Sequence, residues 1–157
     1  MTNAVDAALK QLASISHTLN EVSDQLSKHL IEVESALSAY KLGVSAWVEL
    51  RKEKELSEPD NDGRRYEFTY VEMLGYGKYK GKWGLLAASY CEETFEGEFD
   101  QQHFLRDAPR ETRLAAVEKL PDLLTALTKE AAQVAEEAAK KAEEARQIAA
   151  GLGKKTR

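Results

Sequence analysis

The chain has 157 residues, of which 43% are apolar and 31% charged, and its formal net charge is −5 at pH 7. It has no apolar run near the roughly 18 residues of a membrane-spanning helix, and its first residues lack the basic-then-apolar pattern of a secretory signal, so we expect a single cytoplasmic domain. Cys91 is the only cysteine, which excludes an intrachain disulfide and a thiolate-rich metal site.

An apolar seam with 3-4 spacing runs through the first forty residues and predicts a long coiled-coil-like helix over residues 1–43. At about 1.5 Å per residue, this helix is too long for a small β domain to cover. We therefore expect it to assemble copies of the chain into a homodimer or a higher oligomer. The seam consists of Val5, Ala8, Leu12, Ile15, Leu19, Val22, Leu26, His29, Val33, Ala36 and Tyr40, widened by Leu9, Leu30 and Leu37. The predicted oligomer interface comprises Leu12, Ile15, Leu19, Val22, Leu26, His29, Leu30, Val33 and Leu37.

After Gly43 the apolar period changes to two, which indicates strands and predicts a β head over residues 44–104. In the first strand, Val44, Ala46, Val48 and Leu50 are expected on one face and Ser45, Trp47, Glu49 and Arg51 on the other. A polar turn over residues 52–63 and a glycine-lysine loop over residues 75–81 then separate strands at 65–74 and 82–92. Short connections of this kind favour an antiparallel three-stranded meander. Residues 92–103 fit either a fourth strand or a loop held by Phe95 and Phe99.

The last third of the chain is helical in pattern, with a short helix to Leu120, a break or kink at Pro121 and a long alanine-rich helix to Gly151. We expect residues 105–150 to pack back antiparallel along the first helix, and residues 151–157 to form a flexible tail. A lone solvated helix is the alternative for the alanine-rich part. The predicted fold class is therefore α+β in a single domain.

Basic and aromatic residues alternate around the second and third strands, and these residue types stack on bases and neutralise phosphates. The candidate ligand- or partner-binding residues are Arg64, Arg65, Tyr76, Lys78, Tyr79, Lys80, Lys82 and Trp83. The loop fails the spacing of a P-loop, because three residues separate Gly77 from Gly81-Lys82 and Trp83 follows. The competing interpretation is an ordinary hairpin whose lysines keep a strand edge soluble.

No other stretch carries a specific chemical motif. The acidic segment Glu92 to Asp100 resembles a calcium loop only faintly, since His103 stands where a bidentate glutamate is required, and a basic protein partner would fit it as well. The three histidines lack metal-ligand spacing, and no serine or cysteine lies in a nucleophile motif. We therefore predict no catalytic residue, no metal and no cofactor.

These patterns favour a non-enzymatic, homo-oligomeric interaction or regulatory module of the adaptor, chaperone or inhibitor type. It would assemble through its long helices, bind itself and another protein, and have no membrane partner. The alternative is a binder of a nucleotide, another anionic ligand or single-stranded nucleic acid through the aromatic-basic hairpin.

Overall fold

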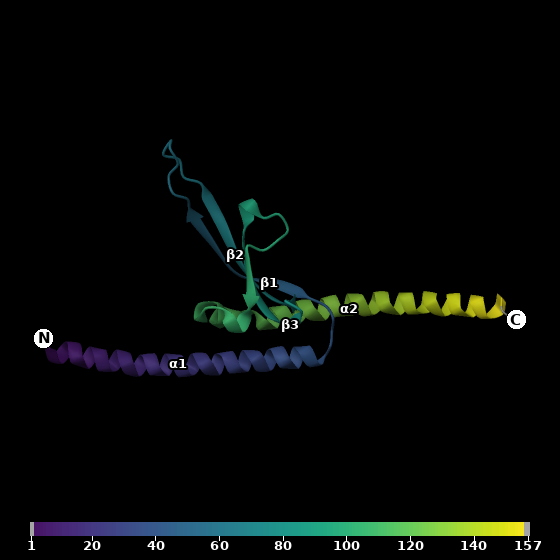
Figure 1. Ribbon diagram of the computed structural model, residues 1–157, viewed down its shortest axis with the longest axis horizontal. Helices are drawn as coiled ribbons and strands as arrows, with labels where there is room; N and C mark the ends of the chain where they lie inside the picture. The colour runs from purple at the N-terminus through teal and green to yellow at the C-terminus, as the bar shows by residue number, and fades with distance from the viewer. Residues whose placement is uncertain (1, 156–157) are drawn as a thin grey trace.

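The computed structural model describes residues 2–155 and has an α+β fold with two long helices and a four-stranded antiparallel sheet (Figure 1). The sheet is a meander in the order β1-β2-β3-β4. The elements are α1 (Thr2–Ala39), β1 (Ala46–Leu56), β2 (Glu67–Tyr79), β3 (Lys82–Cys91), the 3₁₀ turn η1 (Glu92–Thr94), β4 (Gln101–Phe104), the 3₁₀ turn η2 (Leu105–Asp107) and α2 (Arg110–Lys155). The predicted fold class is confirmed, with four strands in place of three.

The hairpin of β2 and β3 closes through a two-residue turn, not through a loop over residues 75–81. Lys80 and Gly81 form this turn with φ values of 49° and 79°, and two positive φ values match the twist of the strands they join. Gly75 lies inside β2, where the ring of Trp47 covers it so closely that an added Cβ would be 2.4 Å from Trp47 Cε3. Gly75 therefore serves packing within a strand and Gly81 serves the turn, so no backbone loop remains to hold a phosphate.

A β-bulge in β1 changes the face on which Arg51 lies. The register with β2 shifts between Glu49 and Arg51, so Arg51 pairs with Glu72 on the helix-facing side of the sheet. Leu50 is buried in the core on that side, as expected, but the placement of Arg51 on the opposite face was wrong. The extra residue of a bulge is what reverses the alternation.

Two clusters of apolar side chains cover the two faces of the sheet. The helix-facing side packs against the second half of α1 and the first half of α2 through Leu30, Leu37, Leu74, Leu85 and Leu123. The segment between η1 and β4 brings aromatic rings together with Trp47 and Tyr90: Phe99 lies 4.7 Å from Trp47, and Phe95 lies 4.4 Å from Tyr90, measured between ring centroids.

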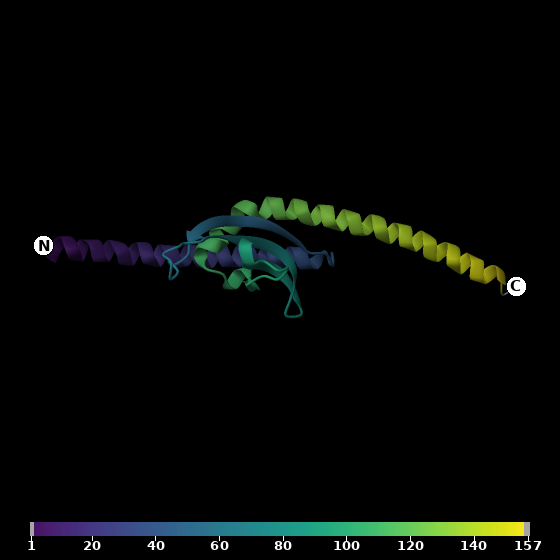
Figure 2. The same ribbon diagram turned by 90° about the horizontal axis from the view of Figure 1, so that it is seen from above.

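The two helices run in the same direction, which corrects the expected antiparallel stalk. Arg113, near the start of α2, binds Ser23 and Ser27 of α1, while further along both helices Leu37 shares a groove with Leu124 and Leu127. Their free ends consequently project on opposite sides of the sheet (Figures 1 and 2). We call residues 2–22 the N-terminal arm and residues 132–155 the C-terminal arm.

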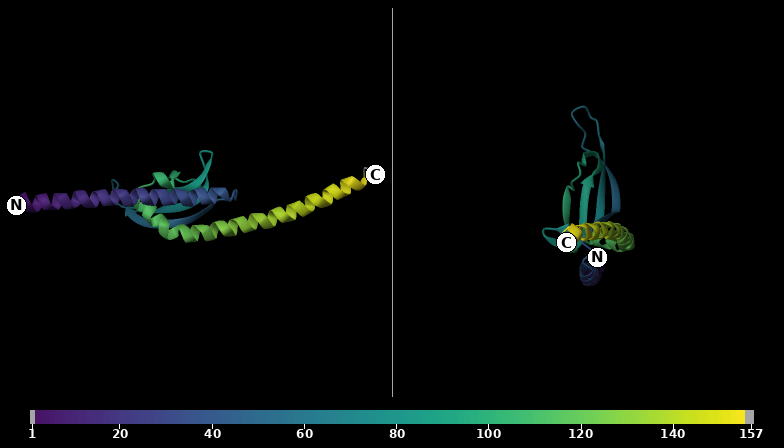
Figure 3. Two further views of the ribbon diagram at one scale, coloured as in Figure 1. Left: turned by 90° about the horizontal axis from the view of Figure 1, so that it is seen from below. Right: turned by 90° about the vertical axis from the view of Figure 1, so that its right-hand side faces the viewer.

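Helix α2 is continuous through Pro121 and curves along its length (Figures 2 and 3), so the predicted division into two helices was wrong. Pro121 is exposed, and water can satisfy the carbonyl that loses its intrahelical partner there. Ala116 and Leu123 are fully buried on either side of it and hold both segments against the sheet. The helix also continues through Gly151 to Lys155, where a flexible tail was expected; residues 156–157 lie outside the described part.

Candidate interaction surfaces

The N-terminal arm carries an apolar seam that no other residue within the described range 2–155 covers. Every side chain of residues 2–22 is exposed, including six large apolar residues that are each 46–62% exposed. These are Val5, Leu9, Leu12, Ile15, Leu19 and Val22. Four of the predicted interface residues, Leu12, Ile15, Leu19 and Val22, thus lie together on one accessible helix face.

The second half of the same seam is part of the chain's own core. Leu30 and Leu37 are buried, and Leu26 and Val33 pack partly buried against the core cluster. Leu30 and Leu37 are therefore core residues, so their assignment to an oligomer interface was wrong, whereas Leu26 and Val33 keep part of their surface accessible. Heptad periodicity marks one continuous stripe, but it does not distinguish a part covered within the chain from a part left open.

His29 does not lie in a packed seam. Its side chain is 69% exposed, and its Nδ1 is 3.1 Å from a carboxylate oxygen of Glu32 one turn away. The core stripe of α1 passes through Leu26 and Leu30 instead, so His29 does not belong to the buried part of the seam.

Two charged residues that the sequence pattern did not single out fasten α1 to the rest of the fold. Arg113 donates hydrogen bonds to the Ser23 carbonyl (3.2 Å), the Ser23 hydroxyl (2.9 Å) and the Ser27 hydroxyl. Glu34 accepts from the Leu85 backbone N–H at 2.8 Å and from Arg106 at 2.9 Å. The uncovered part of the seam therefore ends where Arg113 meets Ser23. Single charged residues on a helix carry no periodic signal, which is why the sequence did not reveal them.

A shallow apolar groove lies between the C-terminal end of α1 and the middle of α2. It has a volume of about 370 Å³ and is lined by Leu37, Tyr40, Leu42, Leu124, Leu127, Thr128 and Ala131. Tyr40 is 73% exposed at its rim. The groove is an accessible apolar surface separate from the N-terminal arm.

The C-terminal arm differs in character from the N-terminal arm. Its side chains are exposed, and ion pairs along the helix surface join Lys140 to Glu136 (3.5 Å) and Arg146 to Glu143 (2.7 Å). The hydrogen bond from Arg146 lowers the pKa of Glu143 below its ordinary value. Such pairs between residues one turn apart stabilise a solvated helix, so this arm has less need of a partner than the apolar arm.

The candidate binding residues of the hairpin are divided between two ends of the sheet. Arg64 and Arg65 precede β2, whereas Lys78, Tyr79, Lys80, Lys82 and Trp83 surround the turn at its far end, thirteen strand residues away. At about 3.3 Å per residue, β2 separates the two groups by roughly 40 Å. They do not form one patch, so the predicted site is reduced to the turn.

At the turn, Tyr76 is only 2% exposed and stacks on Trp83 with ring centroids 5.8 Å apart. Tyr79 packs edge-on against Phe104, and Lys80 lies 5.3 Å from the centroid of the Tyr79 ring. Tyr76 is therefore a core residue and not a stacking platform. Lys78, Lys80 and Lys82 remain exposed around Trp83, whose ring is partly accessible.

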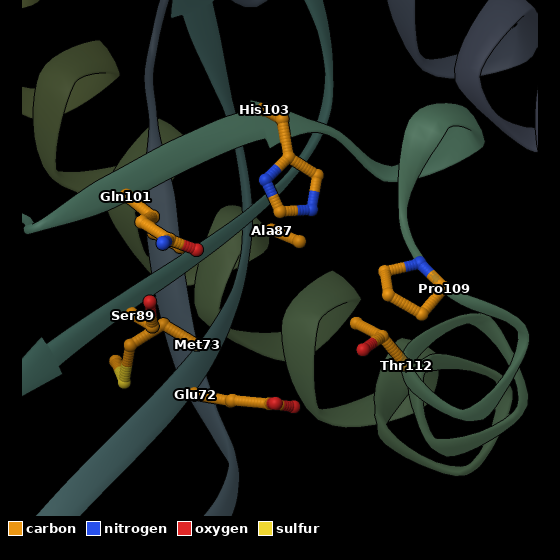
Figure 4. A pocket seen from close by; sticks show the side chains of 9 residues that line it. Glu72, Met73, Ala87, Ser89, Gln101, His103, Pro109 and Thr112 are labelled. Carbon is orange, nitrogen blue, oxygen red and sulfur yellow. The ribbon is translucent and has the colours of Figure 1, made fainter.

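A small cavity of mixed polar and apolar lining lies between β2, β3, β4 and the start of α2 (Figure 4). Its volume is about 110 Å³, and its polar walls come from Glu72, Ser89, Gln101, His103 and Thr112. Nε2 of His103 is buried and has no hydrogen-bond partner among the described residues. A cavity of this size holds a few water molecules. Its other walls are apolar and come from Met73, Ala87, Ala88 and Pro109, and no feature of the lining selects a ligand.

One wall of the cavity is fixed by an ion pair. Arg51 donates two hydrogen bonds to a single carboxylate oxygen of Glu72, at 2.7 and 2.9 Å, and a longer one to Thr112. The bonds to Glu72 raise the pKa of Arg51 above its ordinary value. The pair links β1 to β2 and to α2, which is a structural role that follows from the bulge in β1.

Several carboxylates of the acidic segment Glu92 to Asp100 fasten this segment to the sheet. Glu93 accepts the Thr69 backbone N–H at 2.8 Å, which lowers the pKa of Glu93, and Asp100 accepts the Cys91 backbone N–H at 3.0 Å. Lys52 pairs with Glu92 at 2.9 Å. Among residues 2–155, no three His, Cys, Asp or Glu side chains are arranged to hold a metal ion.

Comparison of the chain with protein-family models, curated proteins and solved structures finds no match. In the described part of the chain, neither helix is both long and apolar enough to cross a membrane.

Proposed function

We propose that this chain is a non-enzymatic, homo-oligomeric interaction module that assembles through the N-terminal arm of α1. The observation that carries the proposal is the row of six large apolar side chains on residues 2–22, each about half exposed. Contiguous exposed apolar surface of this kind marks an interaction site on a folded protein. The sheet and the C-terminal arm would then be available to a second protein, as in an adaptor, chaperone or inhibitor.

The size of the seam supports reversible association. Full burial of a Val, Leu or Ile side chain is worth about 1.5–3 kcal/mol, and about half of each side chain remains to be buried. Twelve such side chains in a dimer offer on the order of 10 kcal/mol. Association costs about 4–15 kcal/mol in lost freedom. The two quantities are of similar size, so we expect a concentration-dependent oligomer instead of an obligate one.

Sedimentation equilibrium over a range of protein concentrations tests the proposal. We expect masses that rise from 17.5 kDa toward a multiple of this value as concentration increases. The seam is bare in the monomer, so mass action must favour its burial at high concentration. A mass that stays at 17.5 kDa up to the solubility limit would contradict the proposal.

A second candidate function, binding of an anionic ligand at the β2–β3 turn, is favoured by exposed lysines close to Trp83, whose side chain is partly accessible. Lys78 and Trp83 are directly paired across the hairpin and share one face. A cation beside an accessible ring is the arrangement that binds single-stranded nucleic acid or a nucleotide.

The matching experiment measures fluorescence anisotropy of a labelled oligothymidylate, with ATP as competitor, at several salt concentrations. We expect Lys78→Glu with Lys82→Glu to weaken binding at least about tenfold, because each lost cation removes a phosphate contact. Lys80 is left unchanged because it forms the turn. The control, Lys28→Glu with Lys129→Glu, makes the same charge change elsewhere. Equal losses in both variants, or no binding by the unmodified chain, would exclude this function.

A further inference from the structure

We infer that the N-terminal arm of one copy pairs antiparallel with the same arm of a second copy, with Val5 facing Val22, Ala8 facing Leu19 and Leu12 facing Ile15. This inference rests on the proposed function and adds to it the direction of pairing and the register.

The register follows from the seam itself. Val5, Leu12 and Leu19 occupy one heptad position, and Ala8, Ile15 and Val22 occupy the second. In an antiparallel pair each residue of the first position faces one of the second. In the register in which the numbers of two facing residues add up to 27, the pairs 5 with 22, 8 with 19 and 12 with 15 each occur twice. The two seams then form six consecutive apolar layers. The interface is then self-complementary and closed by a two-fold axis, with no apolar layer left unpaired.

Charges on the arm neither oppose this pairing nor favour a parallel over an antiparallel arrangement. Positions beside the two core positions set orientation in coiled coils when they carry charge. In the arm these positions are held by uncharged residues: Ala4, Leu9, Gln11, Ser16 and Thr18. The charged residues Asp6, Lys10 and Glu21 fall on the outer face of the helix. The shape of the rest of the molecule must therefore decide between parallel and antiparallel pairing.

The fold excludes the parallel arrangement. Beyond Val22, the stripe of α1 is covered by the chain's own sheet and α2, beginning where Arg113 binds Ser23 and continuing over Leu26, Leu30 and Val33. A parallel partner helix would have to continue into that occupied space. An antiparallel partner instead continues past Val5, away from the sheet, because the arm projects clear of it (Figures 1 and 2).

The last layer ends at the point where the covered stripe begins. Val22 is the final residue of the open seam, and Ser23 is bound by Arg113. Six layers therefore occupy the whole open seam, and the two sheets lie at opposite ends of the paired arms. In the dimer, the second copy covers the apolar stripe of residues 5–22. The chain's own core covers the same stripe from Ser23 onward.

Disulfide formation between variants that each carry one added cysteine tests the register. Val5→Cys and Val22→Cys are prepared separately, mixed while reduced and dilute so that subunits exchange, then concentrated, oxidised in glutathione buffer and run on non-reducing gels. We expect a cross-linked dimer from the mixture and none from either variant alone. Positions 5 and 22 are 17 residues apart, so identical cysteines would lie about 26 Å from each other in the pair. A disulfide needs Cα atoms within about 7 Å.

The controls separate this inference from the proposed function. Cys91 is buried, and the unmodified chain measures its background. Val5→Cys mixed with Asn20→Cys, on the outer face, measures random collision. Sedimentation of the reduced variants reports association independently. Dimers that cross-link in each single variant alone would show parallel pairing, and dimers with no cross-link in the Val5–Val22 mixture would show another interface. Either result overturns the antiparallel register but leaves the finding that the chain self-associates. If the reduced variants and the unmodified chain are all monomers, both the register and the proposed homo-oligomer are overturned.

Discussion

Self-association is expected to weaken by at least about 1,000-fold when Leu12 and Leu19 are both replaced by aspartate. Each substitution removes an exposed apolar side chain from the middle of the open seam and puts a carboxylate in its place. Burying an unpaired charge costs several kcal/mol, a dimer would contain four such groups, and every 1.4 kcal/mol is a tenfold change in the dissociation constant. The measurement is sedimentation equilibrium of the variant beside the unmodified chain.

A matched control makes the same change in net charge on the opposite face of the arm. Ser14→Asp with Asn20→Asp also adds two carboxylates per chain, at positions outside the seam. We expect it to retain the dissociation constant of the unmodified chain within about threefold, since exposed charges interact weakly in salt. If both variants weaken association equally, net charge and not the seam controls it; if neither does, the arm is not the interface.

Replacement of Leu123 by alanine is expected to lower the free energy of unfolding by about 2–5 kcal/mol. Leu123 is 0% exposed and belongs to the core between α2 and the sheet. Its truncation loses buried apolar area and leaves a cavity that the surrounding side chains only partly fill. Urea denaturation followed through the fluorescence of Trp47 and Trp83 measures the change, because both residues lie in the sheet.

This experiment is best done in the Leu12→Asp, Leu19→Asp background, where unfolding is not coupled to dissociation. Leu114→Ala provides the control on the same helix, since Leu114 is 53% exposed and its truncation should cost less than about 1 kcal/mol. Comparable losses from Leu114 and Leu123 would mean that α2 does not pack on the sheet through the face that contains Leu123.

The sequence revealed the candidate surface but not its limits. Its heptad pattern identified Leu12, Ile15, Leu19 and Val22 as one helix face, because a helix places residues of that spacing on one stripe whatever surrounds it. The same pattern also included Leu30 and Leu37, which the core buries. Apolar residues are required equally by a core and by an interface, so composition along the stripe could not separate the two.

In the β2–β3 hairpin, too, the residue types were evident from the sequence, but their burial and contacts were not. Tyr76 and Trp83 were both counted as ligand-binding aromatics, but only Trp83 is accessible. Gly75 indicated a loop because glycine usually interrupts a strand; here the ring of Trp47 fills the space that a side chain would occupy. That contact joins residues 28 positions apart, so local preferences contain no signal for it.

By itself, the sequence determined that this protein has a long helix, an antiparallel meander and a final long helix, because these depend on periods of 3.6 and 2 that are written locally in the chain. Only the tertiary structure decided the parallel course of α1 and α2, the continuity of α2 through Pro121, the reversed face of Arg51, and the boundary at Ser23 between covered and open seam. Each of these depends on contacts between residues distant in sequence, such as Arg113 with Ser23. Their energies arise only when the elements are packed together, so no local pattern can encode them.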